Sequence, residues 1–297
     1  MELYGVVTMD IVGSRSLENR QNIQEQLDNF INEINLDYSQ YLVAPINFTI
    51  GDEWQLITSH PEKVYDFIHL FQQELWQVGV RFYAGVGIGY ISTNWYNDSR
   101  KMDGPCFIAA REAINICKNK PRYGRERSYI YSKSNKIFFR HLVEKNNNNI
   151  NKTVYDDFVF YNMLQKTHGF ELHKQSSEAA VSSDANWEKH QHEGFLFIDN
   201  DYNDKELKFF ALESIINLTI ENNEILKGKM TAKQKEIYRQ YFNAGSYRKI
   251  ADENIRSISS ISQSLNAAEY YTIQRNHDMV RLLINNYCEL IRRENGL

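Results

Sequence analysis

The chain has 297 residues, of which 42% are apolar and 24% charged, and its net charge is −4. This composition is typical of a soluble globular protein, and the length is sufficient for about two domains. The sequence lacks both a long apolar run and the pattern of a secretory signal, and its three cysteines argue against a disulfide framework. We therefore expect a cytoplasmic protein without a membrane partner.

The charge is unevenly distributed along the chain. Residues 226–297 contain 12 Lys or Arg and 7 Asp or Glu, so this segment carries +5 and the rest of the chain −9. A basic segment on an acidic body favours an anionic partner at the C-terminus. A basic helix face that is simply solvated is the alternative.

The first 120 or so residues predict strands that alternate with helices. Residues 3–12 form an apolar run that ends near Asp10, and a turn at 13–16 precedes apolar residues at helical spacing. Gly51 and Asp52 separate two short apolar runs, which indicates a hairpin. The further predicted elements are a helix that Pro61 opens, a strand over Val80–Ser92, a helix from Gly104 and a strand over Arg127–Tyr131.

The order βαββαβ, followed by αβ, predicts an α+β fold of the ferredoxin-like or split βαβ type. Such a fold has an antiparallel sheet with helices on one face. Three glycines at alternate positions, 85, 87 and 89, leave one face of a strand bare, so another element should pack closely there. We expect a palm domain over 1–165, a polar linker over 166–203 and an all-α domain over 204–297.

Two aspartates are the candidate metal ligands. Asp10 lies at the end of the first predicted strand and Asp52 in the hairpin turn, so their carboxylates should converge at one sheet edge. Paired carboxylates repel each other unless a cation lies between them, and Mg²⁺ or Mn²⁺ suits oxygen ligands. A helix N-cap at Asp10 and an ordinary turn at Asp52 are the alternatives. The predicted phosphate-binding segment, at a helix N-terminus, comprises Ile11, Val12, Gly13, Ser14 and Arg15.

The C-terminal third predicts three helices within about 231–275. The second is short, and the third covers 258–273 and is capped by Ser257. The pattern resembles the helix-turn-helix of sigma-factor-like regulators. Gln and Asn side chains can read adenine edges, whereas Ser, Arg and Lys contact phosphate. The candidate DNA-binding residues are Arg248, Lys249, Arg256, Ser259, Ser260, Gln263 and Asn266. A module that dimerises or docks on the palm domain is the alternative.

Four segments resemble motifs of the class III nucleotide cyclases. With the trailing helices, the chain is similar to the SatD family of bacterial proteins. The resemblance implies a cyclase-like palm, two metal-binding aspartates, a transition-state arginine at Arg111 and a homodimer that completes the site. The segments are Val7–Ser14, Phe48–Glu53, Val80–Gly89 and Asp103–Ala113.

The chain departs from the cyclase pattern where cyclases recognise purines. Phe48 replaces the purine-reading lysine, Phe107 replaces the transition-state asparagine, and Arg100 lies near the position of the second base-reading acid. Phe48 and Phe107 are therefore the candidate base-pocket residues. Arg111 could offset charge on the phosphates or form a structural salt bridge.

We interpret the chain as a regulator that binds a nucleoside triphosphate with Mg²⁺ or Mn²⁺ and duplex DNA. A metal-dependent cyclase that uses a non-purine nucleotide is the first alternative. A non-catalytic scaffold with a vestigial site is the second.

Overall fold

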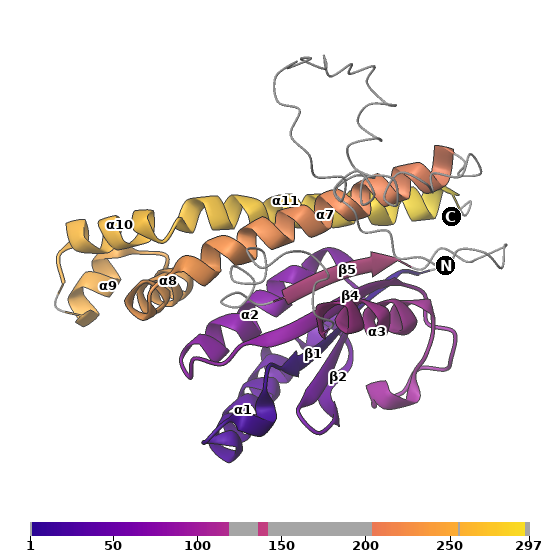
Figure 1. Ribbon diagram of the computed structural model, residues 1–297, viewed down its shortest axis with the longest axis horizontal. Helices are drawn as coiled ribbons and strands as arrows, with labels where there is room; N and C mark the ends of the chain where they lie inside the picture. Colours follow the sequence, from indigo (N-terminus) through magenta and orange to yellow (C-terminus); the bar gives the residue numbers. More distant parts are fainter. Residues whose placement is uncertain (1, 119–135, 142–203, 255, 295–297) are drawn as a thin grey trace, which may run out of the picture. The chain divides into compact units, whose positions relative to one another are not determined.

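The computed structural model describes residues 2–118, 136–141, 204–254 and 256–294. The described residues include a five-stranded sheet in the order β2-β3-β1-β4-β5, together with helices, so the α+β class is confirmed (Figure 1). The strands are β1 (Tyr4–Ile11), β2 (Leu42–Ile50), β3 (Glu53–Thr58), β4 (Phe82–Gly89) and β5 (Lys136–His141). The helices that accompany them are α1 (Arg20–Asp37), α2 (Val64–Trp76) and α3 (Pro105–Lys118).

The sheet is mixed rather than antiparallel throughout. The central strand β1 runs antiparallel to both β3 and β4, whereas β5 runs parallel to β4. The predicted antiparallel sheet is therefore wrong at this edge, because α3 forms a crossover between β4 and β5 and returns the chain in the same direction. The strand predicted at Arg127–Tyr131 lies outside the described residues.

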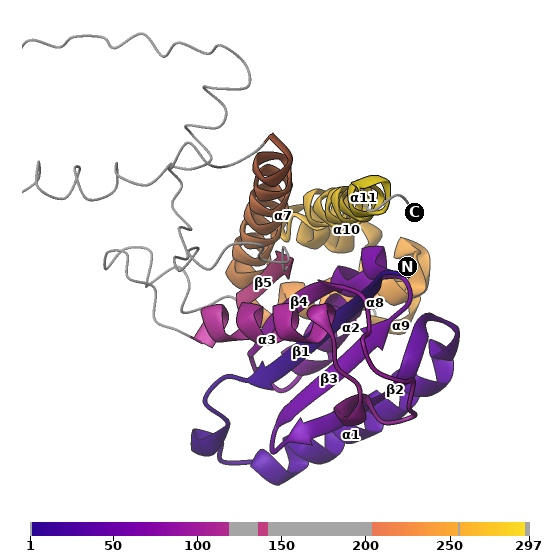
Figure 2. The same cartoon turned by 90° about the vertical axis from the view of Figure 1, so that its right-hand side faces the viewer.

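Helices cover both faces of the sheet, and the prediction that they share one face is wrong (Figure 2). A Cβ atom at Gly87 would lie 2.1 Å from the carbonyl oxygen of Cys106 in α3, and one at Gly5 would lie 2.5 Å from Val64 Cγ1 in α2. Gly87 pairs with Val6, the neighbour of Gly5, so the two glycines face opposite sides. The close packing predicted at the glycine-bearing face is confirmed, and α3 is the element that packs there.

The C-terminal region is helical. Its helices are α7 (Asp204–Lys229), α8 (Ala232–Ala244), α9 (Tyr247–Asn254), α10 (Ile258–Ala267) and α11 (Tyr270–Glu294). As predicted, the Ser257 side chain caps α10, because it accepts a hydrogen bond of 3.1 Å from the Ser260 N–H. The helix predicted over 258–273 is wrong at its C-terminal end. It stops at Ala267 because Glu269 adopts the left-handed conformation, with φ 55°.

Three of these helices, α8 to α10, share an apolar core. Its buried members are Ile237, Ile250, Ile261 and Leu265. Short connections join the three helices, and the buried residues of α10 are spaced i and i+4, which leaves the opposite face of this helix to solvent.

The described residues within 1–143 and 216–297 belong to the first of two compact units. Within the first unit a buried polar cluster joins α2 to α7. It consists of Tyr65, Gln72, Glu224 and Lys227. The domain boundaries at 165 and 203 stay a prediction. Of the helices that the structure describes, none is long and apolar enough to span a membrane.

Candidate functional site

The ends of β1 and β3 bring acidic side chains together. Asp10 on β1 pairs directly with Glu53, the first residue of β3. Asp52 precedes Glu53 in the turn, where Gly51 adopts a left-handed conformation with φ 64°. Both sequence-predicted aspartates therefore lie where β1 ends and β3 begins. Glu53 adds a third carboxylate, for which no role was predicted from the sequence.

Helix α3 supplies cations to these acids. Lys118 Nζ lies 2.7 Å from Asp10 Oδ2 and 3.7 Å from Glu53 Oε2. Arg111 donates from Nη1 to both carboxylate oxygens of Glu53, at 2.9 and 2.7 Å. The Thr49 hydroxyl donates to Glu53 Oε1 at 2.7 Å. The arginine predicted to act on phosphate is therefore ion-paired within its own chain, to an almost fully buried carboxylate.

The electrostatics of Asp10 reflect this crowding. Burial raises the pKa of the Asp10 carboxyl, and the neighbouring charges of Asp52 and Glu53 raise it further. The hydrogen bond and the charge of Lys118 act in the opposite direction and do not fully compensate. The three carboxylates therefore influence one another, and Lys118, Arg111 and Arg20 supply the positive charges next to them.

Asp52 is less completely partnered. Arg20 Nη2 lies 3.8 Å from Asp52 Oδ1, whereas Asp52 Oδ2 is buried without a hydrogen-bond partner. A cavity of about 10 Å³ adjoins it and is lined by Ile11, Ser14 and Phe48, among others. Such a volume holds about one water molecule.

The donor chemistry fits a hard divalent cation, which prefers carboxylate oxygens. Asp52 has a buried oxygen without a hydrogen-bond partner, and its charge acts on the carboxyl of Asp10. A divalent cation would bind that oxygen and reduce the repulsion between the two carboxylates. Within the described ranges, no group of three or more His, Cys, Asp or Glu side chains is placed to hold a metal on its own. Phosphate oxygens or water would therefore have to complete the coordination.

The predicted phosphate-binding segment has a different local structure from the one expected. Gly13 is left-handed, with φ 67°, and a short 3₁₀ helix covers Ser14–Ser16, so α1 begins only at Arg20. The Val12 N–H donates to the carbonyl of Arg81 at 2.9 Å. Because that group is engaged in the fold, phosphate contacts would fall to the exposed part of the turn around Gly13, Ser14 and Arg15.

The two candidate base-pocket residues lie on opposite faces of the sheet. Phe48 lines the small cavity beside α1, together with Ile23 and Leu27. Phe107 is 8% exposed and belongs to the apolar core under α3, with Tyr4 and Val6. One copy of the chain therefore does not bring the two rings together in a common pocket.

The candidate DNA-binding residues are mostly exposed. Ser259, Gln263 and Asn266 lie on one face of α10 at spacings of i, i+4 and i+7, with Ser260 beside them. On α9, Arg248 and Lys249 are also exposed. Arg256 differs from the others because its side chain is half-buried and its Nη1 has no hydrogen-bond partner.

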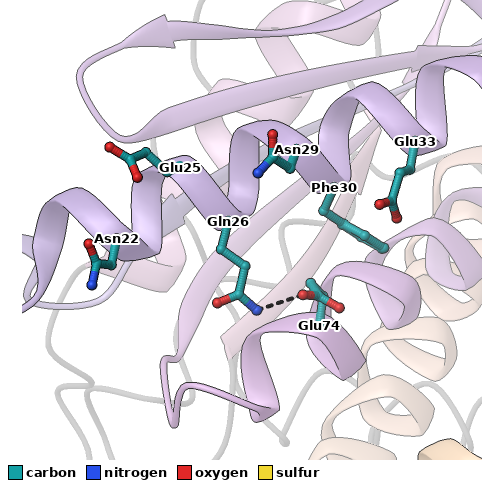
Figure 3. A pocket seen from close by; sticks show the side chains of 7 residues that line it. All are labelled: Asn22, Glu25, Gln26, Asn29, Phe30, Glu33 and Glu74. Atoms are coloured by element: carbon teal, nitrogen blue, oxygen red, sulfur yellow. Dashed lines mark hydrogen bonds between the residues drawn. The ribbon is translucent and has the colours of Figure 1, made fainter.

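A hollow of about 360 Å³, which was not expected from the sequence, lies between α1 and α2 (Figure 3). Glu25, Asn29 and Glu33 recur at i, i+4 and i+8 along α1, a pattern that could have revealed this acidic helix face. Gln26 Nε2 donates to Glu74 Oε1 across the hollow at 2.6 Å. Its carboxylates would repel a triphosphate, so we do not assign the nucleotide to it.

Comparison with known proteins gives one positive result. The family model described as the SatD family matches residues 4–154, about half of the chain. Neither the curated proteins nor the solved structures contain a match to this chain.

Proposed function

Because the chain belongs to the SatD family, we propose that it is a regulator that binds a nucleoside triphosphate at Asp10 and Asp52 and duplex DNA through α9 and α10. The observation that carries the nucleotide part is the crowded acid site, in which Asp52 keeps a buried oxygen without a partner. In this proposal Asp10 and Asp52 hold Mg²⁺ or Mn²⁺, which neutralises the negative charge of the phosphates.

The residues around the acids support triphosphate binding. Arg20 and Lys118 give the acid site two cations that face outward in part, since their side chains are 49% and 35% exposed. Lys118 Nζ lies 2.7 Å from Asp10 and Arg20 Nη2 lies 3.8 Å from Asp52, so both cations can contact phosphate oxygens while the aspartates hold the metal. Gly13 is exposed, and the half-buried Ser14 lines the same small cavity as Asp52, so backbone N–H groups of this turn can also contact phosphate.

The contacts of Arg111 and Phe107 favour binding over cyclisation. Arg111 is committed to Glu53, and Phe107 is packed in the core, where a cyclase has a polar transition-state residue. An active cyclase would need Arg111 to leave Glu53 and meet the phosphates of a second copy. Product analysis by mass spectrometry after incubation with each of the four nucleotides and Mn²⁺ distinguishes the two functions.

Calorimetric titration with the four nucleoside triphosphates tests the binding site. We expect at least one nucleotide to bind with Mn²⁺ and to bind at least about tenfold more weakly after Asp10→Asn or Asp52→Asn, because each variant removes a metal ligand. Asp28→Asn changes an exposed acid on α1 and is the matched control. Undiminished affinity in both site variants, or in the presence of a chelator, would contradict the proposal.

The DNA part of the proposal rests on the two faces of α10. Ile261 and Leu265 are buried against α8 and α9, whereas Gln263 and Asn266 point to solvent. An exposed helix with short polar side chains can enter a major groove, and the +5 charge of residues 226–297 favours contact with phosphates. A homodimer would present two such helices and increase the affinity through bivalency.

Selection from random duplexes at about 150 mM salt, followed by anisotropy titrations, tests DNA binding. Gln263→Ala should weaken binding to the selected sequence by about 1–3 kcal/mol, the contribution of a bidentate base contact. Arg248→Ala should weaken binding to all sequences and reduce the salt dependence, because it removes a phosphate contact. Lys101→Ala removes the same charge from an exposed site outside α9 and α10 and should have little effect. No binding even at about 50 mM salt would instead favour a docking or dimerisation role for these helices.

A further inference from the structure

Two cations project from one side of α3 toward the carboxylates of Asp10 and Glu53, at the end of β1 and the start of β3. Arg111 and Lys118 are seven residues apart, about two helical turns, so they lie on the same helix face. The two cations nevertheless differ in how strongly the fold holds them. Arg111 makes two hydrogen bonds to Glu53, which also accepts a hydrogen bond from Thr49. Lys118 makes one short contact, with Asp10, and a longer one of 3.7 Å with Glu53.

Lys118 is the cation that can leave its partner. It is the last residue of α3, and its side chain is 35% exposed, so rotation about its flexible stem can return the ammonium to water. Withdrawal of Arg111 would instead leave the almost fully buried Glu53 carboxylate without its guanidinium. The geometry therefore separates a structural ion pair, Arg111 with Glu53, from an exchangeable one, Lys118 with Asp10.

We propose that Lys118 is a built-in counter-ion of Asp10 that a divalent cation must displace, so that Lys118 sets the metal affinity of the acid site. This inference rests on the proposed metal site at Asp10 and Asp52. A carboxylate crowded by Asp52 and Glu53 needs a positive partner, and an ammonium group meets that need when no metal is present. A metal ion bonds carboxylate oxygen at about 2.1 Å, and its charge repels an ammonium group held at the same carboxylate.

Titration with Mn²⁺ alone, followed by calorimetry or by the electron paramagnetic resonance signal of free Mn²⁺, tests the role of Lys118. We expect Lys118→Gln and Lys118→Met to bind Mn²⁺ about three- to tenfold more tightly than the wild-type chain, because the competing charge is gone. Lys118→Arg should stay close to wild type, since it retains a cation. Lys101→Gln removes an exposed charge elsewhere and should leave the affinity unchanged.

Thermal unfolding gives a second readout that does not depend on nucleotide. Without metal, Lys118→Gln should have a lower unfolding midpoint than wild type, and saturating Mn²⁺ should raise that midpoint by more than it does in wild type. If wild type binds Mn²⁺ and Lys118→Gln binds it equally or less tightly, the role of Lys118 is overturned while the metal site stands. If no variant binds Mn²⁺, the metal site is overturned together with it.

Discussion

Replacement of Lys227 by methionine should destabilise the protein by about 3–5 kcal/mol, as expected when one partner of a buried ion pair is removed. Lys227 is 1% exposed, and its ammonium lies 2.8 Å from Glu224 Oε1 and 2.9 Å from Gln72 Oε1. Glu224 also accepts hydrogen bonds from Tyr65 and Gln72, so its carboxylate is fixed in the interior. Without Lys227, that carboxylate would keep its hydrogen bonds but lose its counter-charge.

Urea unfolding at pH 7.5 measures this effect. Lys229→Met changes an exposed lysine two residues further along α7, and its free energy of unfolding should stay within about 0.5 kcal/mol of wild type. The double change Lys227→Met with Glu224→Leu removes both charges and should recover a large part of the loss. A Lys227→Met variant as stable as wild type would show that the buried polar cluster does not hold α2 and α7 together.

The protein should also lose stability, on the order of a few kcal/mol, when the pH falls from 7.5 to 5.5, because two buried histidines resist protonation. Burial lowers the pKa of His69 and of His277 well below the usual value, and the nearby charge of Lys227 lowers both further. The unfolded chain takes up both protons below about pH 6.5, whereas the folded chain does not. Stability is therefore fully present above pH 6.5 and is lost as the pH falls below it, by up to about 1.4 kcal/mol per pH unit for each histidine.

Burial sets this sign, and the groups that face the two rings do not reverse it. His69 contacts the Gln72 amide and the Tyr238 hydroxyl, and His277 lies near Arg281 as well as Lys227. Asp66 Oδ1 lies 3.8 Å from His277 Nδ1 and would favour protonation, but Arg281 already pairs with that carboxylate.

Single variants separate the contributions of the two rings. His277→Gln should lose about half of the pH dependence between 7.5 and 5.5, whereas His60→Gln, a change in a less buried histidine, should keep most of it. A free energy of unfolding that does not change between these pH values would contradict the assignment.

Several features could be predicted from the sequence because their signals are local. The positions of Asp10 at a strand end and of Asp52 in a hairpin turn follow from short apolar runs and the Gly51–Asp52 turn. The alternating glycines of β4 indicated a close neighbour, since a side chain at Gly87 would collide with the α3 backbone. The Ser257 cap is likewise encoded within a few residues.

Features that depend on contacts between distant segments could not be predicted. Lys118 and Glu53 are far apart in the sequence, and only the packing of α3 on the sheet brings them together. Glu224 and Lys227 have the sequence character of exposed helix positions, yet they are buried because Tyr65 and Gln72 supply hydrogen bonds from α2. The parallel edge strand β5 likewise follows from the crossover path of the chain rather than from any pattern within its six residues.

The most direct test of the metal-dependent nucleotide site is a crystal structure of the protein with Mn²⁺ and the non-hydrolysable analogue of the nucleotide that binds best. Anomalous scattering from Mn²⁺ locates the ion independently of the protein atoms. We predict a Mn²⁺ peak within about 2.0–2.3 Å of carboxylate oxygens from both Asp10 and Asp52, with phosphate oxygens completing the coordination. Lys118 Nζ, which lies 2.7 Å from Asp10 Oδ2 in the present structure, should then have moved away from it. A triphosphate bound elsewhere, or a Mn²⁺ ion that contacts neither aspartate, would contradict the account.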